Sequence, residues 1–206
     1  MRPIELNYTP ADANLTGFLS NATGATWTLT NTAATDGLAH QISIRNDSAT
    51  DHSGKTALAT GTDVDGYVLT ETITLPAGSA TVESAKYFKT LTSLVPSATI
   101  GADTMDIGWV DEFITQTIPL NWRGGIIGFN TIVGGTINYT VQQTLDDVQQ
   151  LTDRDFNWVN NDDTALVNAT TSKNGNYIGL PSALRVVINS YSSGATLDLF
   201  VNQRNS

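Results

Sequence analysis

The two histidines are the residues whose side chains could do acid–base chemistry near neutral pH. His40 begins an alternating stretch at residues 40–44, and His52 lies in the polar segment 47–54. A hydrolase built on an imidazole also needs a positioned nucleophile and a carboxylate, and the sequence contains no G-x-S-x-G motif. We interpret both histidines as surface or edge residues, and we expect that the protein is not an enzyme and has no catalytic residues.

Carboxylates are plentiful and could serve as metal ligands. Asp63 and Asp65 lie in the short segment 61–66 and carry the oxygen ligands that Ca²⁺ prefers, but this segment does not match an EF-hand loop, which ends in a glutamate. Asp is also a common turn residue. We therefore expect no metal and no cofactor, with Asp63 and Asp65 as weak Ca²⁺ candidates. A glycan hydrolase with two opposed carboxyl groups is a minor alternative.

The four tryptophans could instead anchor a binding surface, because aromatic side chains stack on ligands and dominate many interfaces. Trp27 lies in the alternating stretch 26–30, which favours a place in the core. Trp109 and Trp122 flank the middle of the chain, so we expect them at a domain or subunit border. Exposed tryptophans on a β-sandwich would also suit a carbohydrate-binding module, which Trp122→Ala or Trp158→Ala would test.

Composition narrows the class of partner. Charged residues make up 15% of the 206 residues and the formal net charge is -10. Nucleic acids and anionic membrane surfaces are bound through clustered Lys and Arg, so we expect neither as a partner. The chain has no cysteine, which leaves packing, hydrogen bonds and association to stabilise it. We see no signal peptide or apolar span in the sequence and expect a soluble protein made in a cytoplasm.

Alternating polar and apolar residues recur along the chain and indicate the elements that would position these side chains. The polar residues are mainly Thr, Ser, Asn and Gly, which favour sheets and turns over helices. The sequence therefore predicts an all-β fold, either a β-sandwich or a jelly roll. We predict strands at residues 26–30, 40–44, 55–61, 67–75, 87–95, 105–109, 113–120, 125–133, 137–144, 184–189 and 197–202.

Two hairpins are predicted from this pattern. The first joins residues 55–61 to residues 67–75, and its Asp65-Gly66 step would supply the positive φ that the turn needs. The second joins residues 184–189 to residues 197–202 through a turn at 191–194. Each strand of the second hairpin alternates clearly, which indicates one buried face.

We divide the chain into an N-terminal arm at residues 1–24, a β-sandwich domain at residues 25–111 and a second β-sandwich domain at residues 112–206. A single continuous β body is the alternative. The arm has apolar residues among prolines and glycines, so we expect it to pack on a neighbouring subunit. The predicted interface residues of the arm and of the domain border are Ile4, Leu6, Tyr8, Leu15, Phe18, Trp109 and Trp122.

Several segments resemble β modules of tailed-bacteriophage structural proteins. In the first half these are residues 61–66 (GTDVDG), 70–78 (TETITLPAG), 84–93 (SAKYFKTLTS) and 107–109 (IGW). In the second half they are residues 139–147 (YTVQQTLDD), the aromatic stretch 156–158, residues 175–177 (GNY) and residues 184–201. The resemblance covers roughly residues 55–201 and lies in the order and spacing of the segments.

This resemblance implies a structural component of a virion without an active site. Within that class we expect a capsid decoration (cement) protein that forms a homo-oligomer, most simply a homotrimer, and binds the major capsid protein or other virion proteins. A tail adaptor, baseplate or fibre-attachment protein is the alternative within the virion. The carbohydrate-binding module is the alternative from another class.

Overall fold

The structure is a computed structural model that describes residues 3–120, 127–149, 156–177 and 181–203. Its regular elements are β-strands, apart from one 3-10 helix at Thr164–Leu166. The strands pair antiparallel into several sheets, which confirms the predicted all-β, sandwich-like fold. Within the described residues, no helix has the length and apolar character needed to cross a membrane.

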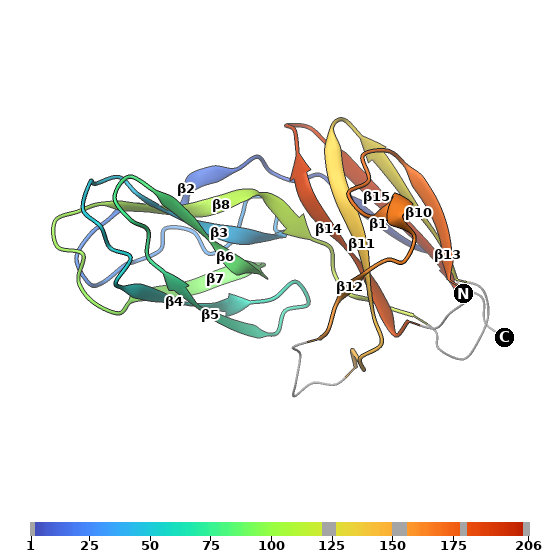
Figure 1. Cartoon of the computed structure of the whole chain (residues 1–206), viewed down its shortest axis with the longest axis horizontal. Coiled ribbons are helices and arrows are strands. Elements are labelled where there is room, and N and C mark those ends of the chain that lie inside the picture. Colours follow the sequence, from blue (N-terminus) through green and yellow to red (C-terminus); the bar gives the residue numbers. More distant parts are fainter. Residues whose placement is uncertain (1–2, 121–126, 150–155, 178–180, 204–206) are drawn as a thin grey trace. The chain divides into compact units, whose positions relative to one another are not determined.

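The chain forms two compact units (Figure 1). Unit 2 is continuous and consists of Ala11–Phe113, whereas unit 1 combines Met1–Pro10 with Ile114–Ser206. The chain therefore passes from unit 1 into unit 2 after Pro10 and returns after Phe113. The second passage lies next to residue 111, which is the domain boundary predicted from the sequence.

Unit 2 contains two sheets that enclose one apolar core. The first sheet has the order β2-β8-β3-β6, and the second has the order β5-β4-β7. The strands are β2 (Asn14–Ala22), β3 (Ala39–Asn46), β4 (Thr56–Thr62), β5 (Val68–Thr74), β6 (Thr81–Phe88), β7 (Thr90–Pro96) and β8 (Met105–Ile114). Both sheets contribute side chains to a single buried cluster, which includes Ile42, Ile44, Leu91, Leu94 and Ile107.

Unit 1 also contains two sheets. One has the order β1-β15-β10-β13, and the other has β12, β11 and β14 side by side, with β9 paired to β14. The strands are β1 (Ile4–Tyr8), β9 (Ile118–Pro119), β10 (Ile127–Gly134), β11 (Ile137–Thr144), β12 (Val159–Asn160), β13 (Lys173–Tyr177), β14 (Ala183–Tyr191) and β15 (Thr196–Gln203). A hydrogen bond of 2.6 Å between Thr131 Oγ1 on β10 and Tyr139 Oη on β11 links the two sheets.

The hairpin predicted over residues 184–202 is wrong, although both of its strands exist. β14 pairs with β11, whereas β15 pairs with β1 and β10, so the short turn between them carries the chain from one sheet to the other. Leu184, Val186 and Ile188 are fully buried, as are Leu197 and Leu199. The two apolar faces line the core from different sheets instead of lying next to each other in one sheet.

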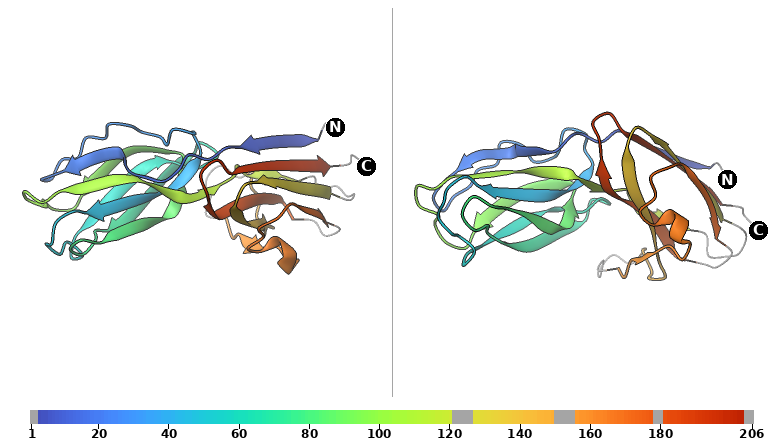
Figure 2. Two further views of the ribbon diagram at one scale, coloured as in Figure 1. Left: turned by 90° about the horizontal axis from the view of Figure 1, so that it is seen from above. Right: turned by 45° about the horizontal axis from the view of Figure 1, so that its top comes forward.

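The N-terminal segment, which the sequence analysis treats as an arm, consists of two strands that are held within this chain. β1 pairs with β15 along its whole length, from Ile4 opposite Val201 to Tyr8 opposite Leu197 (Figure 2). β2 pairs with β8 in unit 2 through a ladder interrupted by two irregularities. Backbone pairing within the chain is therefore sufficient to position this segment.

The strand predicted at residues 26–30 is also wrong. These residues are irregular, because two adjacent N–H groups at the end of the segment share one carbonyl of β2 instead of forming a ladder with it. The N–H groups of Thr30 and Asn31 both donate to Phe18 O, at 2.8 and 3.3 Å. Trp27 nevertheless lies in the apolar core of unit 2 with 7% exposure, as the alternation predicted.

Candidate functional site

The first candidate is the outer face of the sheet β5-β4-β7 in unit 2, which we call the threonine face. Its inner face is buried through Ala57, Ala59 and Leu94. The residues that alternate with the buried ones along each strand point outward and are exposed or half-exposed. The threonine face consists of Thr56, Leu58, Thr60, Thr62, Val68, Thr70, Thr72, Thr74, Thr90, Ser93 and Val95.

The register of the three strands arranges the threonine face in rows. Leu58 lies opposite Thr72 on one side and Val95 on the other, and both aliphatic residues are about half exposed, at 46% and 54%. Val68, beside Thr62, is 81% exposed. None of the residues of this face is charged, whereas the chain carries a net charge of -10. Branched side chains on neighbouring strands give a stiff surface that can pack closely.

Two structural features hold β4 close to β7 and connect this sheet to the other sheet of unit 2. Gly61 on β4 lies where an added Cβ would be 1.8 Å from Thr90 O on β7, so only glycine allows the two strands to approach. The Glu71 carboxylate accepts hydrogen bonds of 2.7 and 2.9 Å from the N–H groups of Ala85 and Lys86 on β6. This carboxylate therefore joins the two sheets of unit 2 at their edge.

The predicted interface residues of β1 and β2 are distributed over both units. Ile4 and Leu6 are half-buried on β1, and Tyr8 is buried with 8% exposure. Leu15 is half-buried on β2, while Phe18 is 2% exposed. Their backbone partners lie in the same chain, so their apolar side chains contribute first to the packing of the units themselves.

Of the two tryptophans predicted at an interface, Trp109 lies within the described residues and Trp122 does not. Trp109 is 2% exposed and packs edge-on against Phe18, with 5.3 Å between ring centroids. Its indole N–H donates to Asp12 O at 3.0 Å. Trp109 therefore packs within unit 2, where its side chain is not accessible to a partner. Trp122 lies outside the described residues.

The weak Ca²⁺ candidates Asp63 and Asp65 lie in the turn between β4 and β5. Asp63 Oδ1 accepts hydrogen bonds from the N–H groups of Asp65 and Tyr67, at 2.9 and 2.8 Å, and Gly66 has a φ of +89°. This is the predicted Asp-Gly hairpin, and the aspartate caps its turn. Across the part of the chain that the structure describes, no three His, Asp or Glu side chains gather as a metal site would require.

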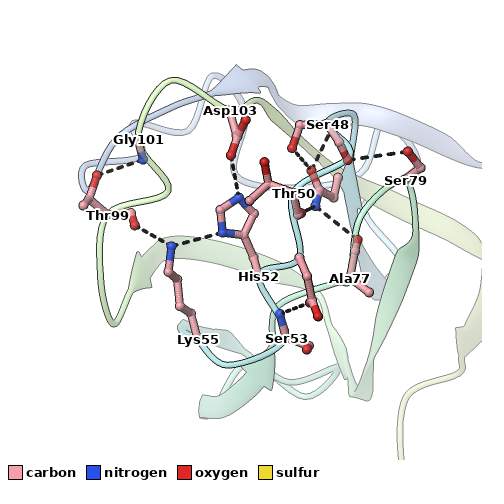
Figure 3. Close-up of polar contacts among 12 residues, drawn as sticks. Ser48, Thr50, His52, Ser53, Lys55, Ala77, Ser79, Thr99, Gly101 and Asp103 are labelled. Carbon is pink, nitrogen blue, oxygen red and sulfur yellow. Dashed lines mark hydrogen bonds and ion pairs between the residues drawn. The ribbon is translucent and has the colours of Figure 1, made fainter.

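A second candidate is a polar cluster around His52, which joins three loops of unit 2 (Figure 3). His52 Nε2 lies 3.0 Å from Asp103 Oδ2, and its Nδ1 lies 3.0 Å from Lys55 Nζ. Lys55 also donates to Thr99 O at 2.8 Å. Because the carboxylate accepts and the ammonium donates, His52 fits this cluster as the neutral tautomer with its proton on Nε2.

The loop next to His52 is held together by hydrogen bonds of the Asn46 side chain. Its amide nitrogen donates to Thr50 O and Ala77 O, at 2.8 and 3.1 Å. Its amide oxygen accepts from the N–H and the hydroxyl group of Ser48. All four of the hydrogen bonds that this amide can make are therefore used inside the protein.

The arrangement of carboxylate, imidazole and amine around His52 resembles part of a catalytic triad, but its geometry does not suit catalysis. In a triad the free imidazole nitrogen faces a nucleophile, whereas Lys55 already occupies that position here. His52 is 3% exposed, so a substrate has no access to the ring. The contacts of His52, Lys55 and Asp103 hold the loops of unit 2 together.

His40 is likewise buried, with 1% exposure. Its Nδ1 lies 3.1 Å from Val110 O and its Nε2 lies 2.9 Å from Asp36 Oδ2, so both ring nitrogens face oxygen acceptors. Burial alone would raise the pKa of Asp36, but hydrogen bonds from His40, Ala11 and Leu38 lower it below its ordinary value. The expectation of surface or edge histidines was wrong, because both imidazoles are buried and each contacts a residue more than 50 positions away in the sequence.

The threonine face was not singled out from the sequence, although its signal was present. Residues 70–74 alternate Thr with Glu or Ile, and the outward positions of such a strand usually include charged residues. Comparison of the chain with protein-family models, with curated protein sequences and with solved structures finds no match.

Proposed function

We propose that this protein is a structural component of a tailed-phage virion, and specifically a head decoration protein that works as a homo-oligomer. Its role is mechanical: copies associate with one another and with the major capsid protein, and the buried surface resists the pressure inside the head. An obligate interface of this kind buries more than about 2,000 Å². No catalytic group, metal or cofactor is needed for this role.

The observation that carries the proposal is the uncharged threonine face. Two copies with a net charge of -10 each repel, so association is favoured where neither copy brings charge to the contact. Burial of the exposed Leu58, Val68 and Val95 removes apolar surface from water. We therefore assign the contact between copies to the threonine face, and its occupant to a second copy of this chain.

The tail-associated alternative uses the same surface with a different partner. A tail adaptor, baseplate or fibre-attachment protein would also associate through an uncharged sheet face. The threonine face supports assembly in either location, and the resemblance to phage β modules supports a virion. The two locations differ in whether the protein adds to purified heads or to purified tails.

The experiment is native mass spectrometry of the purified protein, alone and after incubation with phage heads or tails. We expect a trimer that adds to heads. Leu58→Glu places a carboxylate at the centre of the threonine face, where copies would bring like charges together, and we expect it to give monomers. A 46% exposed side chain tolerates this change without unfolding.

Ile132→Glu is the matched control, since Ile132 is an aliphatic strand residue in unit 1 with a similar exposure of 43%. It should remain trimeric and keep its occupancy on heads. A wild-type protein that stays monomeric and ignores heads would contradict the decoration role. Binding to tails alone would move the protein to the tail, and an unchanged trimer in Leu58→Glu would contradict the assigned face.

A further inference from the structure

Unit 1 contains a cavity of about 430 Å³ near the ends of β11, β12 and β13. This volume falls in the range of about 300–1,000 Å³ that small-molecule sites usually have. The cavity combines amide, carboxylate, phenol and aliphatic side chains on its wall. It is separate from the threonine face, which belongs to unit 2, and the inference drawn from it does not rest on the assembly role.

Tyr177 provides a buried hydrogen-bond donor on the wall of this cavity. The side chain is 8% exposed, and its hydroxyl oxygen accepts a short hydrogen bond from Asn161 Nδ2. Within the described residues, the Tyr177 hydroxyl donates to no acceptor. A buried donor without an acceptor is unfavourable unless water or a ligand supplies one.

The direction of this hydrogen bond is fixed by the contacts of Asn161. Its Oδ1 accepts from the N–H of Asp163 at 2.9 Å, which places the amide nitrogen towards Tyr177. The same nitrogen lies 3.5 Å from Gln143 Oε1. Since the amide can only donate on this side, the phenol must use its oxygen as the acceptor and keep its proton for a further partner.

The charge around the cavity selects against anions. Burial raises the pKa of Tyr177 to about 12, a hydrogen bond from Asn161 lowers it, and the Asp162 carboxylate raises it further. The phenol is therefore a neutral donor at physiological pH. Asp162 and Asp163 line the same cavity and would repel a phosphate or a carboxylate. A ligand with both hydroxyl donors and hydroxyl acceptors fits these groups.

Two aliphatic side chains on the wall of the cavity are unusually exposed. Leu145 is 80% exposed after the end of β11, and Val159 on β12 is 55% exposed. A pyranose ring carries both apolar C–H groups and hydroxyls. The C–H groups can pack on aliphatic side chains while the hydroxyls bond to the polar groups beside them. Trp158 is not part of this wall; the Arg185 guanidinium lies 4.3 Å above its ring centroid.

We propose that this cavity binds a neutral sugar residue. One sugar hydroxyl accepts a hydrogen bond from the Tyr177 hydroxyl, and another donates to the Asp162 carboxylate. The C–H face of the ring packs on Leu145 and Val159. The proposal concerns binding alone.

The proposal is tested by binding of the full chain to an array of neutral and acidic glycans, followed by affinity measurement on the best neutral glycan. Tyr177→Phe removes only the donated hydroxyl, and we expect affinity to fall about tenfold. Tyr67→Phe makes the same chemical change in unit 2, which contributes no residue to the cavity wall, and should leave affinity unchanged. Thermal unfolding of both variants verifies that they are folded.

Leu145→Gln is the second variant, because a side chain that is 80% exposed can be changed without unfolding the protein. We expect it to weaken binding several-fold through the lost apolar contact. No binding to neutral glycans, or binding unchanged by Tyr177→Phe and Leu145→Gln, would overturn the proposal. Binding that is abolished by a Ca²⁺ chelator and insensitive to Tyr177→Phe would assign the carboxylates to a cation instead and also overturn it.

Discussion

The polar cluster around His52 in unit 2 and the polar cluster around Tyr177 in unit 1 contain similar groups, but they differ in what remains unpaired. In the His52 cluster, Asp103 contacts one ring nitrogen of His52 and Lys55 contacts the other. The side-chain amide of the neighbouring Asn46 also makes all four of its possible hydrogen bonds. In the Tyr177 cluster, the phenol accepts a hydrogen bond from Asn161, donates to no acceptor among the described residues, and belongs to a residue that lines a cavity.

This difference shows that burial and carboxylate contacts do not by themselves identify a binding site. A closed cluster, in which every donor has an acceptor, contributes to stability and specifies loop positions. An open cluster, in which one buried donor has none, keeps that donor for a ligand. Substitutions in the His52 cluster should therefore affect mainly stability, and substitutions in the Tyr177 cluster should affect mainly binding.

The largest loss of stability is expected at Gly61 in unit 2, where the backbones of β4 and β7 lie in close contact. Gly61→Ala would place a Cβ 1.8 Å from Thr90 O, and the strands β4 and β7 would have to separate. We expect a loss of about 3 kcal/mol in the free energy of unfolding of unit 2, measured by urea denaturation. Gly54→Ala is the control, since an added Cβ there meets nothing within 4 Å, and it should be nearly neutral.

His52→Ala should reduce the stability of unit 2 by about 2 kcal/mol, because Asp103 and Lys55 would both lose a partner. Lys55→Met removes a half-buried donor that also bonds to Thr99 O, and its effect should be smaller. Denaturation curves of the two variants separate these contributions. If His52→Ala were as stable as the wild type, the cluster would not hold the loops.

Asp36→Asn should cost about 1–2 kcal/mol at neutral pH, because the carboxylate accepts hydrogen bonds from His40, Ala11 and Leu38. The pKa of Asp36 is lowered in the folded protein, so its contribution is present above the ordinary value of 3.8 and is lost as the pH falls through the folded value. The difference between wild type and variant should therefore shrink below about pH 4. Thermal unfolding from pH 7 to pH 2 measures this convergence.

Tyr177→Phe should have the smallest effect on stability, about 1 kcal/mol or less, because Asn161 keeps its contacts with Gln143 and Asp163. The folded pKa of Tyr177 is about 12, raised from 10.0, so its contribution is complete below pH 10 and is lost as the pH rises towards 12. The variant should lack this alkaline component. An equal alkaline loss in the wild type and the variant would show that other tyrosines cause it.

The two predicted hairpins show how far the sequence specifies the fold. The connection between β4 and β5 was predicted correctly because Asp65-Gly66 fixes a local turn, and Gly66 has the required positive φ. The connection between β14 and β15 has an equally clear alternation, yet its strands enter different sheets. Alternation identifies which residues are buried but does not identify the strand that lies beside them.

The candidate sites were less predictable than the fold, for a related reason. Asp103 lies 51 residues from His52, and Tyr177 lies 16 residues from Asn161 on a different element, so neither pairing leaves a local pattern. The threonine face also requires the register of three strands before its uncharged surface can be recognised. Only the turn aspartates, whose partners are two and four residues away, could be interpreted locally.

The pairing of β1 with β15 has a consequence for the order of events on the ribosome. Residues 11–113 emerge as one continuous segment, so unit 2 can fold before synthesis ends, as domains generally do. Ile4 must wait for Val201, and unit 1 cannot close until that residue has been translated. Until then the first strand remains unpaired, and a cell would need to protect it from edge-to-edge aggregation.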